Sequence, residues 1–503
     1  MTGSPGKLSG RIARGSAWIT LSRALVNLLG FVSTIVLARL LVPADFGLIA
    51  LGTTMLAIVN AMTSFSLNQA LIQHKSPTDD HFHSAWTLSA ARGLLIATAF
   101  SLAAVPLSRF YDDPRLANVI YALSFSIFMS GLANPRRIIL QKKLIFWQDF
   151  VLNVSQKLVG AIVGITIALI YQSYWALIAS VVAAQAANVL ISYCVLPFRP
   201  RITLRHVGEL WSFSVWLTLS QAVNTLNWRF DQLLIGKFLG RSELGYYTVG
   251  DNLASLPTRE ATIPLTQTLF PAFATLAGDA SRLRDAYQRA QSLVTAIALP
   301  VGVIVTLVAE PLVRITMGEK WLPAVTVIEM LAAVFAIQMI GSLVQPLGMA
   351  LGKTRTLFLR DTQIFLFRVP TILIGMYFGG LHGVLIARIV TGTSGIFLNM
   401  MLVRQFIDVS IARQLLANVR AIVSVLCMTA GAIALRAFVF PFATTGAGLL
   451  LEIGATVMLA ALLYGAVSLS IWALGGRPKG PETEMINAIS KGMQSLKRAR
   501  DRG

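Results

Sequence analysis

Charged residues are scarce in this chain, and acidic residues are the scarcest of them. Of its 503 residues only 13% are charged and 55% are hydrophobic. This composition excludes an ordinary soluble domain, in which roughly a quarter of the residues are charged. The 22 Asp and Glu residues stand against 42 Lys and Arg residues, which leaves a formal net charge of +20. The sequence therefore indicates a membrane protein with a large basic surplus.

Cysteine is almost absent, and metal- or cofactor-binding motifs are missing. Cys194 and Cys427 both fall in apolar runs, so neither a disulfide framework nor a cysteine metal cluster is expected. Residues 79–83 (DDHFH) follow Pro77-Thr78 and read better as a helix start than as metal ligands. Residues 348–354 (GMALGKT) are one residue short of a phosphate-binding P-loop and follow a membrane span rather than a strand. We expect no metal and no cofactor.

Long apolar runs are abundant. A membrane-spanning helix needs about 20 mainly apolar residues, and runs of this kind recur along the whole chain. They predict an all-α polytopic membrane protein with about fourteen transmembrane helices. The predicted spans are 17–41, 47–71, 84–106, 116–134, 150–171, 174–196, 210–233, 245–272, 287–309, 324–349, 358–378, 381–403, 421–440 and 447–474. The first is too long for a cleavable signal peptide and contains Arg23 and Arg39, so it should stay as a helix.

The basic residues alternate between loops. Most of the Lys and Arg residues outside the spans fall in every second loop and in the two ends of the chain, including the basic tail 475–503. Cytoplasmic segments carry such an excess, so both termini are predicted to lie in the cytoplasm. The surplus charge then faces anionic membrane lipids, and no nucleic acid partner is implied.

The sequence contains an internal repeat. Residues 16–24 (SAWITLSRA) align with 214–222 (SVWLTLSQA), and the same register pairs Asp45 with Glu243 and Gly47 with Gly245. Six spans separate the two copies, so the copies share one orientation and form a parallel repeat. We therefore predict an N-terminal lobe at 1–209, a C-terminal lobe at 210–403, two additional helices within 404–474, and a cytoplasmic tail at 475–503.

Polar residues in the repeated spans are spaced three or four apart, as on one face of a helix. The row Arg23, Asn27 and Thr34 has its counterpart at Gln221, Thr225 and Gln232. Polar side chains are costly against lipid, so these faces should line a water-filled cavity. The alternative is ordinary hydrogen bonding between helices by Ser, Thr and Asn.

Ionisable residues inside spans are functional candidates, and cations outnumber anions among them. A positive cavity would attract phosphate, which suits the fork of arginine. The predicted substrate-binding residues of this cationic cavity are Arg23, Asn27, Asn60, Arg92, Lys157, Gln221, Arg229, Arg259 and Arg368. The candidates for binding a coupling ion are Asp231, Asp251 and Glu260.

Several of these charges also have a structural reading. Arg229 could pair with Asp231, and Arg259 with Asp251. Arg436, at the end of its span, could extend its guanidinium to the membrane interface. Glu329, Arg436 and Glu452 are weaker functional candidates than the other ionisable residues inside the spans.

The span at 245–272 contains Pro257, Pro264 and Pro271 at seven-residue spacing. Each proline removes a backbone hydrogen bond, so this helix should bend. Pro257 and Pro264 are the predicted hinge residues for alternating access, although packing around kinks is an equally ordinary use.

Several segments carry a family resemblance. They are 36–47 (VLARLLVPADFG), 174–177 (YWAL), 231–240 (DQLLIGKFLG), 244–247 (LGYY), 269–272 (LFPA) and 318–324 (GEKWLPA). In this order they resemble Wzx-type polysaccharide transporters of the multidrug/oligosaccharidyl-lipid/polysaccharide flippase superfamily. Lipid II flippases of that superfamily carry an Arg-Asp pair after the Gly-Phe of helix 1, whereas Gly30-Phe31-Val32 leads here to Ser33-Thr34.

The resemblance implies a V-shaped bundle of two six-helix lobes, as in MATE-type extruders, plus helices 13 and 14. It also implies a flippase that moves an undecaprenyl-diphosphate-linked oligosaccharide to the periplasmic leaflet by alternating access, for surface or exopolysaccharide synthesis. A polysaccharide polymerase would be a partner, and coupling to protons or sodium stays open. The alternatives are an ion-coupled multidrug or metabolite antiporter of the same fold and a membrane glycosyltransferase or polymerase. The outward loops are too short for the latter, so no enzyme is expected.

Overall fold

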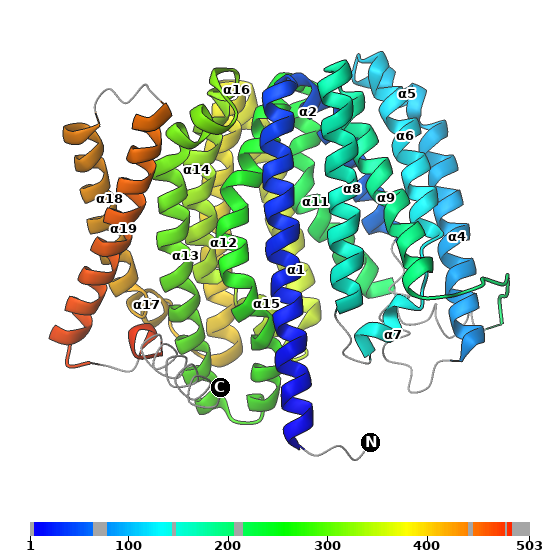
Figure 1. The fold of residues 1–503 in the computed structure, drawn as a ribbon. Helices are drawn as coiled ribbons and strands as arrows, with labels where there is room; N and C mark the ends of the chain where they lie inside the picture. The colour runs from blue at the N-terminus through cyan, green and yellow to red at the C-terminus, as the bar shows by residue number, and fades with distance from the viewer. Residues whose placement is uncertain are drawn as a thin grey trace, which may run out of the picture. The chain divides into compact units, whose positions relative to one another are not determined.

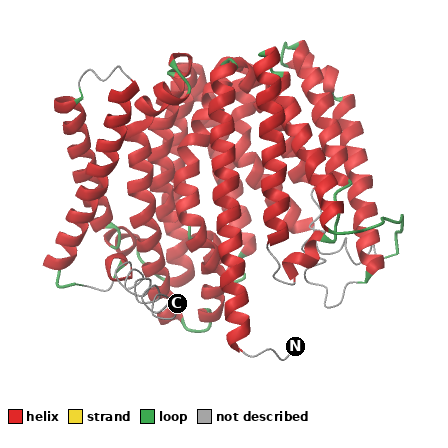
Figure 2. Ribbon diagram, in the orientation of Figure 1, coloured by secondary structure: helices red, strands yellow, loops and turns green. Residues whose placement is uncertain are grey.

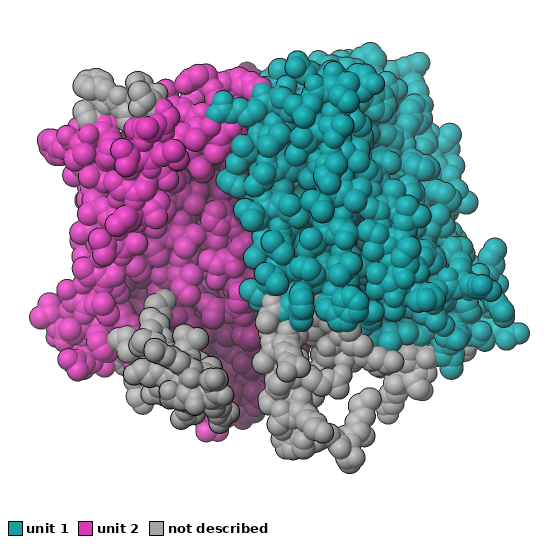
Figure 3. Space-filling model, viewed as in Figure 1, with its two compact units in different colours: residues 1–248 teal, residues 249–503 magenta. Residues whose placement is uncertain are grey.

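The computed structural model describes residues 5–63, 78–142, 147–205, 215–440, 446–477 and 480–484; side chains are described from residue 18 on, except at 19, 141, 142 and 215–221. Within these ranges all regular structure is helical and there are no strands (Figure 2). The all-α prediction is therefore confirmed. The chain divides into two compact units, Met1–Thr248 and Val249–Gly503 (Figure 3). The lobe boundary predicted from the repeat, at 209/210, stays a prediction.

The first unit contains nine complete helices among its described residues and the start of a tenth. They are α1 (Pro5–Leu40), α2 (Pro43–Thr63), α4 (Asp79–Leu102), α5 (Ala104–Phe110), α6 (Pro114–Gly131), α7 (Arg137–Lys142), α8 (Trp147–Tyr171), α9 (Trp175–Val195), α11 (Val215–Phe238) and the first residues of α12 (Arg241–Leu276) (Figure 1).

The second unit contains the rest of α12 and the helices that follow it. They are α13 (Ala280–Thr316), η1 (Glu319–Trp321), α14 (Pro323–Gln338), η2 (Met339–Gly341), α15 (Val344–Ala350), α16 (Thr354–Ile407), α17 (Ile411–Leu416), α18 (Val419–Val439) and α19 (Gly446–Leu474).

The helices account for the predicted spans. Ten helical segments in the described part of the chain are long and apolar enough to cross a membrane. One of them, α16, contains two predicted spans, 358–378 and 381–403, which meet where Gly379 and Gly380 leave helical geometry. The predicted spans 116–134, 210–233 and 245–272 overlap α6, α11 and α12, whose polar residues make them less apolar. Residues 64–71 and 210–214 of the predicted spans lie outside the described residues. The polytopic fold is thus confirmed.

Local signals set several helix ends. Thr78 caps α4 together with His81, whose ring accepts a hydrogen bond from the Thr78 backbone at 3.2 Å. The segment 79–83 is therefore a helix start, as predicted. Asp113 caps α6 just before Pro114, and Asp279 caps α13. Pro257, Pro264 and Pro271 lie inside the continuous helix α12, and their role as hinges stays a prediction.

Repeat-equivalent residues meet at the starts of α2 and α12. A Cβ atom on Gly47 would lie 2.8 Å from the carbonyl carbon of Arg241, and one on Gly245 would lie 2.8 Å from the carbonyl carbon of Pro43. Pro43 and Arg241 occupy equivalent positions of the repeat, as do the two glycines. The two helix starts therefore approach symmetrically, and only glycine allows this backbone separation.

The two helices outside the repeat, α18 and α19, pack against each other and against α13 in the second unit (Figure 1). Their shared core contains Ala296, Leu299, Val425, Met428 and Ala460. Small residues at such contacts let helices approach closely, which is how helices associate in a membrane. The Tyr464 hydroxyl donates to the backbone oxygen of Ala296 at 2.7 Å, so this aromatic side chain is also satisfied.

Candidate functional site

Helices α1 and α8 bring three predicted site residues to one side of the first unit. The Lys157 side chain of α8 lies against Gly30 of α1, since a Cβ there would be 3.1 Å from Lys157 Cε. Arg23, Asn27 and Gly30 follow at steps of four and three, so they share a face of α1. The side chains of Arg23, Asn27 and Lys157 are partly buried. The structure thus places Lys157 beside the predicted polar face of α1.

Asn60 and Arg92, also predicted together, are in direct contact. The Arg92 Nη2 group donates to the Asn60 backbone oxygen at 3.1 Å, to Asn60 Oδ1 at 3.1 Å and to Thr63 Oγ1 at 3.2 Å. These bonds tie α4 to α2. These acceptors satisfy part of the hydrogen-bonding capacity of the Arg92 guanidinium. Because all of them are neutral, they do not balance its positive charge.

The alternative in which Arg229 pairs with Asp231 is not found among the described residues. Arg229 Nη1 donates to Gln232 Oε1 at 3.4 Å instead. Asp231, only 2% exposed, accepts from the Tyr247 hydroxyl and from the Gln232 backbone N–H at 2.9 Å. Hydroxyl and amide donors hold this carboxylate because Tyr247 points into α11 from the start of α12.

Gln232 extends this network, since it accepts a hydrogen bond from Thr54 of α2. The network therefore links three helices of the first unit. The side chain of Gln221, the other amide predicted on α11, lies outside the described residues.

The alternative in which Arg259 pairs with Asp251 is not found in the described part of the chain either. Asp251 lies 3.6 Å from Arg388 of α16, whose guanidinium is 2% exposed and stands 5.7 Å from the ring centroid of Phe335. Arg259 is 3.7 Å from its neighbour Glu260, and its side chain is 59% exposed. Sequence spacing along α12 could not reveal Arg388, because that partner comes from a distant helix.

Arg368, the last predicted cation, is buried in α16 at 6% exposure. A second buried group on the same helix was missed, because the first residues of the predicted span 358–378 were counted with the cytoplasmic loop before it. Arg360 and Asp361 are 7% and 6% exposed and pair at 2.6 Å. Arg360 also donates to Gln345 at 2.7 Å. In the sequence, the direct succession of an arginine and an aspartate at 360–361 could have indicated this pair.

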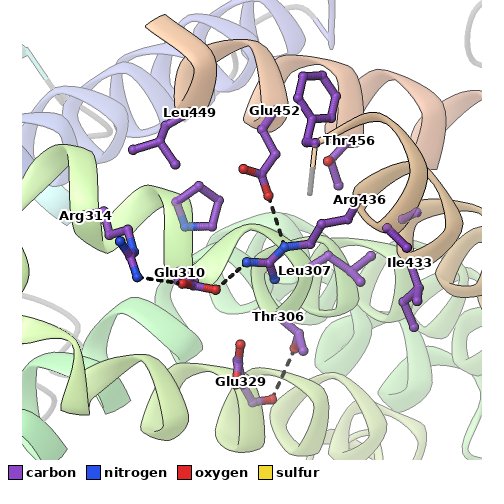
Figure 4. A pocket seen from close by; sticks show the side chains of 14 residues that line it. Thr306, Leu307, Glu310, Arg314, Glu329, Ile433, Arg436, Leu449, Glu452 and Thr456 are labelled. Carbon is purple, nitrogen blue, oxygen red and sulfur yellow. Dashed lines mark hydrogen bonds and ion pairs between the residues drawn. The ribbon is translucent and has the colours of Figure 1, made fainter. Parts of the chain in front are cut away.

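A cavity of about 720 Å³ lies between α13, α14, α18 and α19 (Figure 4). On its wall Arg436 bridges Glu310 and Glu452, with 3.1 Å between Arg436 Nε and Glu452 Oε1. Glu310 also pairs with Arg314 at 3.1 Å. Arg436 thus joins an ion-pair cluster, and whether its guanidinium also reaches the membrane interface stays a prediction.

Glu329 lines the same cavity and Thr306 donates to its backbone oxygen at 3.3 Å (Figure 4). Glu310 and Arg314 were missed because the sequence placed them in an outward loop. Their spacing of four residues was the available signal. This charged cluster fastens the two additional helices to α13.

The described residues contain no group of three or more His, Cys, Asp or Glu side chains that could hold a metal ion. The contacts so far are confined to single units. Whether the cationic side chains of both units face one cavity therefore stays a prediction.

The known proteins to which this chain is similar are named for the biosynthesis of polysaccharides. The model of a family described as "Polysaccharide biosynthesis protein" matches residues 36–326. The lipopolysaccharide biosynthesis protein WzxC of Escherichia coli K12 is 25% identical over 379 residues, which cover 74% of this chain and 76% of the relative. The succinoglycan biosynthesis transport protein ExoT of Rhizobium meliloti 1021 is 25% identical over 323 residues, which cover 64% and 65%.

Among solved structures, the lipid II flippase MurJ in an inward closed conformation superposes with a TM-score of 0.71. The alignment covers 92% of this chain and 99% of that chain at 14% identity. At this identity the similarity shows a shared fold.

Proposed function

Since this chain belongs to the polysaccharide biosynthesis protein family, we propose that it is a flippase. Its cargo is an undecaprenyl-diphosphate-linked oligosaccharide repeat unit, which it moves from the cytoplasmic to the periplasmic leaflet by alternating access. The relatives named for lipopolysaccharide and succinoglycan synthesis support a cargo destined for surface or exopolysaccharide. Transport requires no catalytic group, and the proposal assigns none.

The observation that carries this proposal is the set of cations at membrane depth in the first unit. Arg23, Arg92 and Lys157 lie within predicted spans, and Arg92 is bonded to neutral acceptors alone among the described residues. An uncompensated cation is costly at that depth unless an anion visits it. A diphosphate supplies such an anion, whereas an exporter of organic cations would need acidic groups there.

The membrane potential provides a driving force for this cargo. Moving one charge through 100 mV is worth about 2.3 kcal/mol. A diphosphate dianion leaving a negative cytoplasm would release roughly twice that energy. Asp231, Asp251 and Glu260 are the proposed sites of proton or sodium coupling. Asp251 and Glu260 pair with arginines, and Asp231 accepts from Tyr247.

The decisive test is the leaflet in which the lipid-linked oligosaccharide resides after the protein is depleted from cells. We expect the headgroup to accumulate facing the cytoplasm while surface polymer is lost. Normal exposure of the headgroup on the outer leaflet would contradict the proposal and favour the antiporter or the polymerase.

The cationic residues can be tested separately with Arg23→Ala, Arg229→Ala and Arg259→Ala at matched expression. We expect polymer export to fall in these variants, because each loses a guanidinium available to phosphate. Normal export by all three would move the headgroup site elsewhere without touching the flippase assignment. Arg109→Ala, on a short helix outside the predicted cavity, is the matched control.

A further inference from the structure

A second cavity, of about 450 Å³, lies within the first unit between α2, α4, α6 and α7. The polar groups on its wall are neutral or cationic: Asn60, Ser89, Arg92, Ser130, Asn134 and Arg137. No Asp or Glu is among the described residues that line it. Its volume falls in the range typical of small-molecule sites. The cavity is complete within one unit.

The two arginines on this wall differ in their partners. Arg137 is neutralised by Asp149 of α8 at 2.8 Å and also donates to Asn153 at 2.8 Å. Arg92 bonds through Nη2 to Asn60 and Thr63 only, as far as the described residues go. Its Nε group is buried without a hydrogen-bond acceptor there. The cavity therefore holds one positive charge that no described carboxylate balances, together with unused N–H donors.

Hydroxyl groups and close helix packing complete the site. Ser89 of α4 and Ser130 of α6 present hydroxyls to the same cavity as Arg92. Gly93 and Gly131 bring α4 and α6 together, since a Cβ on Gly93 would lie 3.1 Å from the Gly131 Cα. The Ser130 hydroxyl donates to the Ile127 backbone oxygen at 2.7 Å, so the donors that the cavity offers an anion are the Arg92 guanidinium and the Ser89 hydroxyl, both on α4.

The depth of the cavity fits a lipid phosphate. Arg92 lies about two turns into the predicted span 84–106. Arg137, which also lines the cavity, lies in the segment 135–148 that is predicted to be cytoplasmic. From this depth an arginine side chain can reach back along the span toward the phosphates of the inner leaflet, and a guanidinium beside a serine hydroxyl suits a phosphate. We infer that this cavity is a phosphate-binding site, centred on Arg92, for the headgroup of a lipid.

Two lipids of the inner leaflet carry that chemistry: a polyprenyl diphosphate and an anionic phospholipid. If the phosphate belongs to the polyprenyl diphosphate, the inference rests on the proposed function, and the cavity receives the cargo before it crosses. If it belongs to a phospholipid, the cavity anchors the first unit to the leaflet.

Binding to the purified full-length protein tests the inference directly. The probes are farnesyl diphosphate, farnesol, phosphatidylglycerol and phosphatidylcholine, each added to protein in neutral detergent while ligand-induced thermal stabilisation is measured. We expect Arg92→Gln to weaken phosphate-probe binding roughly tenfold or more, because a charge-assisted hydrogen bond is lost. Arg109→Gln, an exposed arginine of α5 in the same unit, should bind as the wild type does.

A second variant covers the case in which Arg92→Gln unfolds. Ser130→Asp leaves the bonds between Arg92 and Asn60 in place and puts a carboxylate into the cavity, so it should also abolish binding of the phosphate probes. Ser130→Asn is its uncharged control.

If farnesyl diphosphate binds in an Arg92-dependent way and farnesol does not bind, the result would support the site and identify its ligand as the cargo. Arg92-dependent binding of phosphatidylglycerol alone would support it and identify a bilayer lipid. Equal binding by folded Arg92→Gln, Ser130→Asp and wild-type protein would overturn it, as would binding of chloride as tight as that of the phosphate probes. None of these results uses transport, so the outcome is separate from that of the depletion experiment.

Discussion

Arginines of similar appearance in the sequence lie in three different environments. Arg92 donates to neutral groups beside a cavity. Arg388 is buried against Asp251 and the ring of Phe335. Arg259 is largely exposed and contacts only its neighbour Glu260 among the described residues. A buried charge is costly unless an opposite charge compensates it. Because Asp251 compensates Arg388, we expect Arg388 to have a structural role. The described partners of Arg92 do not compensate its charge, so we expect Arg92 to bind a ligand.

Removing one partner of the buried pair should destabilise the second unit. We expect Asp251→Asn to lower the free energy of unfolding by about 3 kcal/mol, because Arg388 would remain buried with its charge less well compensated. The double variant Asp251→Asn with Arg388→Met should recover part of this loss. Denaturant unfolding in detergent micelles measures both changes.

The pair of Arg284 and Asp408, whose side chains are 42% and 82% exposed, is the matched control. Asp408→Asn should cost less than about 1 kcal/mol because water screens that pair. Equal effects of Asp251→Asn and Asp408→Asn would contradict the structural role of Arg388.

At the scale of helices, glycine positions decide which elements can touch. The starts of α2 and α12 approach through Gly47 and Gly245, and neither position has room for a methyl group. By contrast, nothing lies within 4 Å of a Cβ placed on Gly454 of α19. The close packing of helices therefore requires glycine at positions 47 and 245 but not at position 454.

Gly47→Ala and Gly245→Ala should each destabilise the first unit by about 1–3 kcal/mol, because the new methyl group must displace backbone atoms. Thermal unfolding in detergent measures this loss. Gly454→Ala should leave stability unchanged or raise it by up to about 1 kcal/mol, since alanine favours a helix over glycine. Similar melting temperatures for all three variants would refute the close approach.

The start of α13 makes a prediction about pH. The Ser281 hydroxyl donates to Asp279 at 2.7 Å and the Arg282 backbone N–H donates at 3.1 Å, and these bonds hold the pKa of the Asp279 carboxyl below its usual range. A lowered folded-state pKa means that the carboxylate stabilises the helix at neutral pH. This stabilisation is lost as the pH falls through the folded-state pKa.

We therefore expect Asp279→Ala to melt below the wild type at about pH 6, with the gap closing as the pH approaches about 3. Asp279→Asn keeps an acceptor without titrating, so its melting point should depend less on pH than that of the wild type over this range. A gap between Asp279→Ala and wild type that is constant from about pH 6 to about pH 3 would exclude this cap as the titrating group.

At the scale of the whole molecule, the distribution of Lys and Arg predicts which loops face the cytoplasm. Glu319 lies in a predicted outward loop and its side chain is 71% exposed. Arg355 lies in a predicted cytoplasmic segment and is exposed. In a background with Cys194→Ser and Cys427→Ser, Glu319→Cys should react with a membrane-impermeant maleimide in intact cells. Arg355→Cys should react only after permeabilisation, and the reverse pattern would invert the topology.

Much of the fold follows from the sequence because it depends on local properties. The number of membrane helices, the duplication and the helix start at Asp79 could be predicted, since apolar length, repeated patterns and capping residues act within a few turns. The list of cations at membrane depth is likewise a property of the chain. Asn60 and Arg92 are both among the predicted site residues and are in direct contact, which the sequence did not predict; their common role in a site stays a prediction.

The pairing of charges was decided by the tertiary structure alone. Arg229 and Asp231, or Arg259 and Asp251, are close in sequence, yet Asp231 accepts from Tyr247 and Asp251 pairs with Arg388. The cluster around Arg436 joins α13 to helices outside the repeat. A buried charge takes the partner that packing brings to it, at any separation along the chain, so spacing within one helix could not predict these contacts.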